Sequence, residues 1–162
     1  RRAETVWRTG LRKAHTLSRQ PAFVWLWLPP VWCLLGLSKA LIMLVAFRRL
    51  SKVLGRNMGV TSWVPLLTEP QIAHARHIGQ TIKIASRYTP WESNCFPQAL
   101  VARLLLGWFG VPYALSFGLM RDTVSTDLKA HAWVTAGPIP VTGGRNDGQY
   151  AVVGVFVSPG LL

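Results

Sequence analysis

The chain is organised around the stretch Ser86-Arg-Tyr-Thr-Pro-Trp-Glu-Ser-Asn-Cys-Phe-Pro-Gln-Ala-Leu-Val-Ala-Arg-Leu-Leu-Leu106. A loop with proline and tryptophan runs into an apolar helical pattern here, and Cys95 stands at the junction. Pro97 fits the first turn of a helix, because its missing N–H has no intrahelical partner there. Ser93 or Asn94 can cap the free amides of that turn. The residues spaced for a core-facing stripe on this helix are Leu100, Val101, Leu104, Leu105 and Trp108.

The position of Cys95 at a helix N-terminus suits a reactive thiol. The positive end of the helix dipole and the free N–H groups favour the thiolate and lower the pKa of a thiol placed there. The same N–H groups could hold an oxyanion after the sulfur attacks a carbonyl. The competing interpretation is a buried free cysteine that packs as a small hydrophobic residue.

The composition predicts one domain, or one domain with an N-terminal extension, in a chain of 162 residues. Cys33 lies in an apolar stretch and Cys95 at a polar helix entry, which argues against a disulfide and favours a reducing cytoplasm. The four histidines and two cysteines have no zinc-site spacing, so no metal is expected.

The charge balance is strongly basic, with 18 Lys and Arg against 6 Asp and Glu. Composition alone leaves acidic peptide, anionic lipid and nucleic acid open as partners. The basic residues are spread along the chain, unlike the single basic face of a nucleic-acid binder, so no nucleic-acid partner is expected. Any carboxylate in a site must come from Glu4, Glu69, Glu92, Asp122, Asp127 or Asp147.

Residues 21–47 are apolar and long enough for a transmembrane span, which needs about 20 residues. Pro29 and Pro30 would break this run into pieces too short to cross a membrane, and Lys39 lies within the second piece. We therefore expect a buried or interfacial helix in place of a span.

That helix is predicted from about residue 31 to residue 54 and should end at Gly55. Residues 1–20 are basic and polar and do not resemble a secretory signal. Residues 1–56 are thus expected to form a basic N-terminus and an apolar helical region that packs on the core or on a membrane surface. Residues 57–162 should form the core domain.

The second half of the chain changes from helical to strand periodicity. A helix is expected from about residue 69 to residue 87, with Thr68 as its cap. His74 and His77 fall outside the apolar stripe of this helix and are expected to face solvent. Strands are predicted at 113–120, 130–135, 139–142 and 150–157, with turns at Gly137-Pro138 and 143–148. Helices followed by a small antiparallel sheet make an α+β domain.

A cysteine nucleophile needs a base, and the candidate is His131 at the start of an expected strand. Taken alone, His131 fits a half-buried strand histidine bonded to backbone. Two motifs taken together are a more specific signal than His131 alone. They are Trp91-Glu-Ser-Asn-Cys-Phe-Pro-Gln-Ala-Leu100 and, about 35 residues later, Ala130-His-Ala-Trp-Val134. This order resembles the transglutaminase-like cysteine peptidases that remove the leader from lasso-peptide precursors, the B-proteins of lasso-peptide biosynthesis. Further similarity lies in Tyr88-Thr-Pro90, Gly110-Val-Pro112, Phe117-Gly118, Val141-Thr-Gly-Gly144, Tyr150-Ala-Val-Val153 with Phe156, and the helix at 31–47 with Arg48-Arg-Leu50.

The resemblance implies a transglutaminase-like, papain-like core in which Cys95 attacks the carbonyl at the leader–core junction. His131 would first hold the proton and then pass it to the leaving amine. Gln98 looks like the glutamine that recurs beside the family's nucleophile, although a solvent-exposed helix residue is an equal reading.

The third catalytic residue departs from the family pattern. If Gly137-Pro138 centres a hairpin, the positions opposite His131 are about Gly143 and Gly144, where the family commonly carries an aspartate. Asp147 is our choice for the catalytic carboxylate. One alternative is Asn146, which would give a Cys-His-Asn site, and another is a Cys-His dyad without a third residue. The loop residues Asp122 and Asp127 are further alternatives.

No cofactor is expected in this chain, because it has no Walker-type loop. Any ATP dependence should reside in an ATP-dependent lasso cyclase. The resemblance also implies a lasso precursor peptide as substrate, a small leader-recognition protein as partner, and a place in the cytoplasm or peripheral to the inner face of the membrane. Acyl transfer to an amine and a non-catalytic, membrane-associated scaffold are the competing functions.

Overall fold

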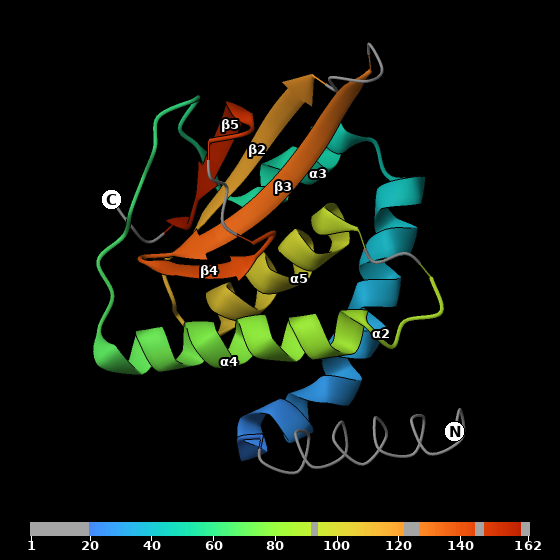
Figure 1. The fold of residues 1–162 in the computed structure, drawn as a ribbon, viewed down its shortest axis with the longest axis vertical. Coiled ribbons are helices and arrows are strands. Elements are labelled where there is room, and N and C mark those ends of the chain that lie inside the picture. The colour runs from blue at the N-terminus through green and yellow to red at the C-terminus, as the bar shows by residue number, and fades with distance from the viewer. Residues whose placement is uncertain (1–19, 92–93, 122–126, 145–147, 160–162) are drawn as a thin grey trace, which may run out of the picture.

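The structure is a computed structural model, and it describes residues 20–91, 94–121, 127–144 and 148–159. Within these residues, four helices precede the main part of a five-stranded antiparallel sheet with strand order β1-β5-β2-β3-β4. Helix α5 lies between the sheet and α2, and α4 runs along the side of β4 (Figure 1). The predicted α+β class is confirmed. The elements are α2 Ala22–Leu44, α3 Phe47–Leu54, β1 Arg56–Asn57, α4 Glu69–Ser86, α5 Cys95–Trp108, β2 Ala114–Arg121, β3 Leu128–Ala136, β4 Ile139–Thr142 and β5 Ala151–Val157.

The core lies where α5 is enclosed by α2, α4 and the sheet. Val31 and Leu35 of α2 are fully buried there, together with Ile78 of α4. Two members of the predicted α5 stripe, Leu104 and Trp108, are instead exposed. Successive residues spaced by four are rotated by about 40° around a helix. Leu104 and Trp108 are therefore rotated progressively away from the buried face on which Leu100 lies.

The apolar helix near the N-terminus differs from its prediction. Helix α2 runs without interruption from Ala22 to Leu44 and contains both Pro29 and Pro30. The two prolines have no N–H to donate to the carbonyls of Trp25 and Leu26, four residues earlier. All four residues are exposed, on the side of the helix away from the core. The helix ends before Ala46, and α3 follows and ends at Gly55.

Helix α2 also bears on the question of a membrane span. By length and composition alone it qualifies as a membrane-crossing helix, and among the residues described it is the one that does. The argument that Pro29 and Pro30 divide it into short pieces is wrong, because the helix continues through them. Its inner face nevertheless packs on α4 and α5.

Helix α4 begins as predicted, with Thr68 at its N-cap. The Thr68 N–H donates to Oε1 of Gln71 at 3.0 Å, and Nε2 of Gln71 donates to the Gly110 carbonyl at 2.9 Å. The expectation that His74 and His77 face solvent is wrong. Both are half-buried, because α2 and α5 cover this side of α4. The ring of His74 stacks on that of Phe109 with the centroids 5.0 Å apart, and the ring of His77 stacks on that of Phe23 with the centroids 5.6 Å apart.

The four predicted strands are confirmed as β2 to β5, and β1 was not predicted because only two residues form it. The β3–β4 hairpin turns at Gly137-Pro138, as expected. Tyr113 joins this sheet to α3, since its hydroxyl donates to the Leu54 carbonyl at 2.9 Å. Burial raises the pKa of Tyr113, although the positive charge of Arg103 acts in the opposite direction.

Candidate active site

Cys95 is the first residue of α5 and is half-buried. Asn94 precedes it in an extended conformation at the N-cap, and the first helical bond runs from the Gln98 N–H to the Asn94 carbonyl at 3.5 Å. The N–H groups of Cys95 and Phe96 therefore have no acceptor within the helix. Cys33 and Cys95 are both free thiols, which confirms that they form no disulfide.

Helix α2 shapes the loop that delivers Cys95 to its position. Trp32 packs on Trp91 at a tilt of 51° with their ring centroids 5.0 Å apart, and its Nε1–H donates to the Tyr88 carbonyl at 3.2 Å. A Cβ on Gly36 would lie 2.9 Å from the ring of Trp91, so the tryptophan fits only over a glycine. The entry to α5 is thus held by an element about 60 residues earlier in the chain.

His131 lies on β3 and is half-buried between aromatic rings. Its ring centroid is 4.9 Å from that of Tyr150 and 5.8 Å from that of Trp133. Its Nε2 is 2.9 Å from the carbonyl oxygen of Gly143. A carbonyl only accepts hydrogen bonds, so Nε2 must carry the proton, and the neutral ring then has an unprotonated Nδ1 that can act as a base.

Gly143 occupies the position where the resemblance implied an aspartate. The hydrogen bond brings its carbonyl to His131, but the predicted register is not observed, because the pairing shifts between Val134 and Thr135 and places Thr142 opposite Val134. Its φ is +80°, and a Cβ there would lie 2.4 Å from Cβ of Trp133. A side chain therefore does not fit without movement of the hairpin, and the acceptor that the structure gives His131 here is the main-chain carbonyl of Gly143.

Of the other candidates for the third catalytic residue, the structure describes only Asp127. Asp147, Asn146 and Asp122 lie outside the described residues. Asp127 is exposed and precedes His131 by four residues of extended chain, which span about 13 Å.

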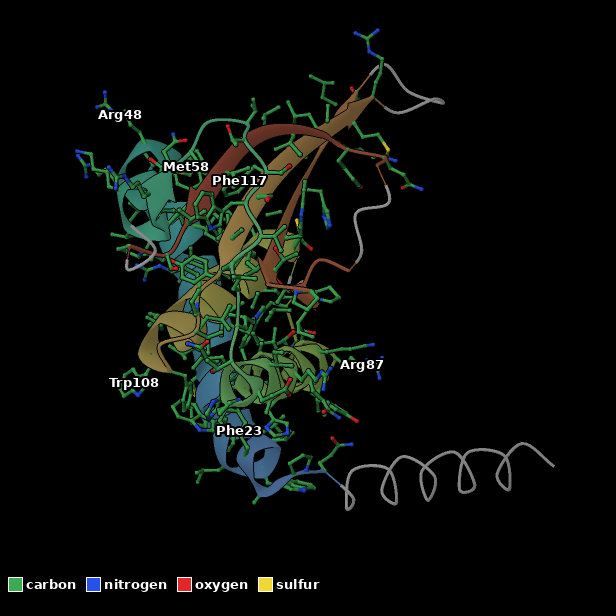
Figure 2. The ribbon with its side chains drawn as sticks, turned by 90° about the vertical axis from the view of Figure 1, so that its left-hand side faces the viewer. Phe23, Arg48, Met58, Arg87, Trp108 and Phe117 are labelled. Atoms are coloured by element: carbon green, nitrogen blue, oxygen red, sulfur yellow. The ribbon has the colours of Figure 1, made fainter. Side chains whose placement is uncertain are left out.

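Cys95 and His131 line the same groove, which runs between α4 and β4 and has a volume of about 1200 Å³. Gln98 lines it too, one turn into α5. One wall is basic, because Arg76 and Lys83 of α4 and Arg87 at its C-cap contribute to the lining; Arg87 marks this side in Figure 2. No carboxylate belongs to the part of the lining that the structure describes.

The basic wall was missed in the sequence, although a signal for it exists. Arg76, Lys83 and Arg87 are spaced by seven and four residues, which places them on one side of α4 away from its apolar stripe. The charge was interpreted as spread because the sequence does not show which side of α4 faces the groove.

One comparison with known proteins gives a match. A family model described as the transglutaminase-like superfamily matches residues 41–155, which is more than half of the chain and includes Cys95 and His131. No curated protein and no solved structure matches the chain.

Proposed function

Because the chain belongs to the transglutaminase-like superfamily, we propose that it is a cysteine peptidase that removes the leader from a lasso-peptide precursor. Members of this superfamily are generally cysteine-dependent enzymes. The observation that carries the proposal is the groove shared by Cys95, at a helix N-terminus, and His131, whose ring is tied to a main-chain carbonyl. The sequence resemblance to the leader peptidases supplies the choice of substrate.

The proposed reaction has two stages. In the first, Nδ1 of His131 takes the thiol proton, and the sulfur of Cys95 forms a bond to the scissile carbonyl carbon. The resulting oxyanion is stabilised by free N–H groups in the first turn of α5. The intermediate then collapses, the peptide C–N bond breaks, and His131 returns the proton to the leaving amine. In the second stage a water molecule, deprotonated by His131, hydrolyses the thioester and frees Cys95.

The main-chain acceptor defines what His131 can do. The Gly143 carbonyl fixes the Nε2–H tautomer and also stabilises the imidazolium that forms when Nδ1 accepts a proton. A neutral carbonyl stabilises this cation less than a carboxylate does, because a hydrogen bond to an ionised partner is roughly twice as strong. The dyad with a main-chain orienting group is thus our preferred form of the site.

The groove gives the proposal a substrate preference. The basic wall formed by Arg76, Lys83 and Arg87 favours a peptide segment with acidic side chains near the cleavage site. We expect a small leader-recognition protein to deliver the precursor, and an ATP-dependent cyclase to use the released core peptide.

Mass spectrometry of the cognate precursor tests this function. The precursor is incubated with the full chain and its leader-binding partner, and separate leader and core peptides are expected, with the mass of one water added in total. Products whose summed mass exceeds that of the precursor by one amine, with the amine joined to the acyl fragment, would instead identify acyl transfer. An unchanged precursor with the native protein, under conditions where the leader-binding partner binds it, would refute the peptidase.

A further inference from the structure

The outer face of α2 is apolar over its whole length. Every exposed position of this helix carries an apolar side chain or a cysteine, while its one serine, Ser38, is buried. We call these exposed positions the α2 face. They are Ala22, Trp25, Leu26, Pro29, Pro30, Trp32, Cys33, Leu37, Ala40, Leu41, Met43 and Leu44.

The α2 face is too large to be an ordinary feature of a surface in water. A helix of 23 residues is about 34 Å long, and scattered single apolar residues are common on proteins whereas a continuous apolar face is not. The face continues onto neighbouring helices. Trp108 of α5 is 75% exposed, and its ring centroid lies 6.4 Å from that of Trp27 of α2. Phe47 at the start of α3 is 50% exposed.

The opposite side of α2 cannot be released into a bilayer. Val31 and Leu35 are fully buried in the core between α4 and α5. If α2 crossed a membrane, these contacts would be lost and the core would be opened to water. The helix can therefore place one face in lipid while the other stays on the domain, as interfacial helices do.

Positive charge lies next to the C-terminal end of the α2 face. Arg48, Arg49 and Lys52 are exposed on α3, directly after α2, and Arg56 follows. The sequence has no Asp or Glu between residues 20 and 68. An apolar face that leads into a cluster of cations matches an anionic lipid surface, whose headgroups attract Lys and Arg and whose interface accommodates Trp.

We propose that the protein docks on an anionic membrane through the α2 face, with the basic residues of α3 at the headgroups. The orientation leaves the groove open to substrate. Arg48 and Trp108 lie at one side of the molecule in Figure 2, and Arg87, which lines the groove, lies at the other. This inference does not depend on the reaction that the groove performs.

Binding of the full chain to lipid vesicles tests the apolar part of the proposal. Sedimentation with vesicles of phosphatidylcholine containing phosphatidylglycerol should show binding, and Leu37→Glu/Leu44→Glu should abolish it. The matched control is Val64→Glu/Leu66→Glu, which alters two equally exposed residues in the connection before α4, on the side of the molecule away from α2 (Figure 1). Circular dichroism confirms that both variants are folded.

The basic part has its own test. Each Lys or Arg near an anionic surface strengthens binding by about fivefold, so Arg48→Gln/Arg49→Gln/Lys52→Gln should weaken it by on the order of a hundredfold. Binding should fall with salt and be weaker on pure phosphatidylcholine. Alkaline carbonate should release the native protein from membranes.

Several results would overturn the proposal. Absence of vesicle binding by the native chain would do so, as would equal losses in the α2 and control variants. Retention after carbonate extraction would show that α2 crosses the bilayer. A dimer that dissociates in Leu37→Glu/Leu44→Glu would assign the α2 face to a second copy of the chain.

Discussion

Replacing Gly143 with alanine tests whether main-chain geometry controls His131. At φ +80°, an alanine costs about 1–2 kcal/mol relative to glycine. Its Cβ would also lie 2.4 Å from Cβ of Trp133, whereas ordinary contact begins at 3.4 Å, so the hairpin must move by about 1 Å. The hydrogen bond of 2.9 Å between His131 and the Gly143 carbonyl would stretch beyond useful length.

A displacement of this size at a catalytic group can lower the rate on the order of 100-fold, and we expect that loss in kcat with little change in KM. Steady-state cleavage of the precursor measures it. The ring tautomer gives a readout independent of activity. In protein labelled with ¹⁵N-histidine, the neutral ring of His131 should be the Nε2–H form in the native protein and a mixture of both forms in Gly143→Ala.

Gly144→Ala is the matched control. Gly144 also has positive φ, +70°, but no atom lies within 4 Å of where a Cβ would be. This variant should lose about 1–2 kcal/mol of unfolding free energy and keep both its rate and its tautomer. If Gly143→Ala retained the native rate and tautomer, the Gly143 carbonyl would not be the orienting group, and the reasoning would fail.

Three further predictions concern single side chains. Cys95→Ala and His131→Ala should each abolish cleavage without unfolding the protein, and the double variant should be scarcely worse, because the two act as one proton-transfer unit; leader cleavage by either folded variant would end the peptidase hypothesis. Asp147→Asn should lower the rate only a few-fold, because the Gly143 carbonyl already accepts the hydrogen bond from Nε2–H of His131. A loss near 10⁴-fold would identify Asp147 as the catalytic carboxylate. Because the pKa of Tyr113 is raised in the folded state, its contribution to stability is present below the ordinary value of 10.0 and is lost as pH rises above it. The unfolding free energy of Tyr113→Phe, measured in urea, should therefore be about 1 kcal/mol lower than that of the native protein at neutral pH, and the difference should narrow above pH 10.0. A difference that stays constant with pH would contradict this prediction.

Local patterns in the sequence were enough to predict most elements. Helix α4 has both a cap and an apolar stripe, and β2 to β5 have period-two patterns bounded by turn residues, so propensity and burial agree there. The hairpin turn predicted that Gly143 lies near His131, but the register shifts between Val134 and Thr135, so Thr142 lies opposite Val134 and the contact with His131 is made by the Gly143 carbonyl.

The sequence could not show contacts that depend on how the elements pack. Pro29 and Pro30 normally end a helix, but tertiary contacts on the inner face of α2 hold it together through them. The acceptor for His131 is a main-chain carbonyl, which has no residue signature in the sequence, whereas a catalytic carboxylate would have one. For the same reason the sequence did not show that Gly36 accommodates Trp91, nor that His74 packs on Phe109.

Because the hydrogen bond from His131 to the Gly143 carbonyl orients the catalytic imidazole, the activity of the site depends on whether the β3–β4 hairpin stays closed. Strand β4 has four residues and lies at the end of the sheet, supported on its outer side by α4, where Gly79 allows close approach to Val141. Short terminal strands open at lower free energy than the core of a protein. On heating, the imidazole should lose its orientation while Cys95 is still held by α5, so inactivation precedes the global transition. A peptide inhibitor bridging α4 and β4 would raise the inactivation temperature more than the melting temperature.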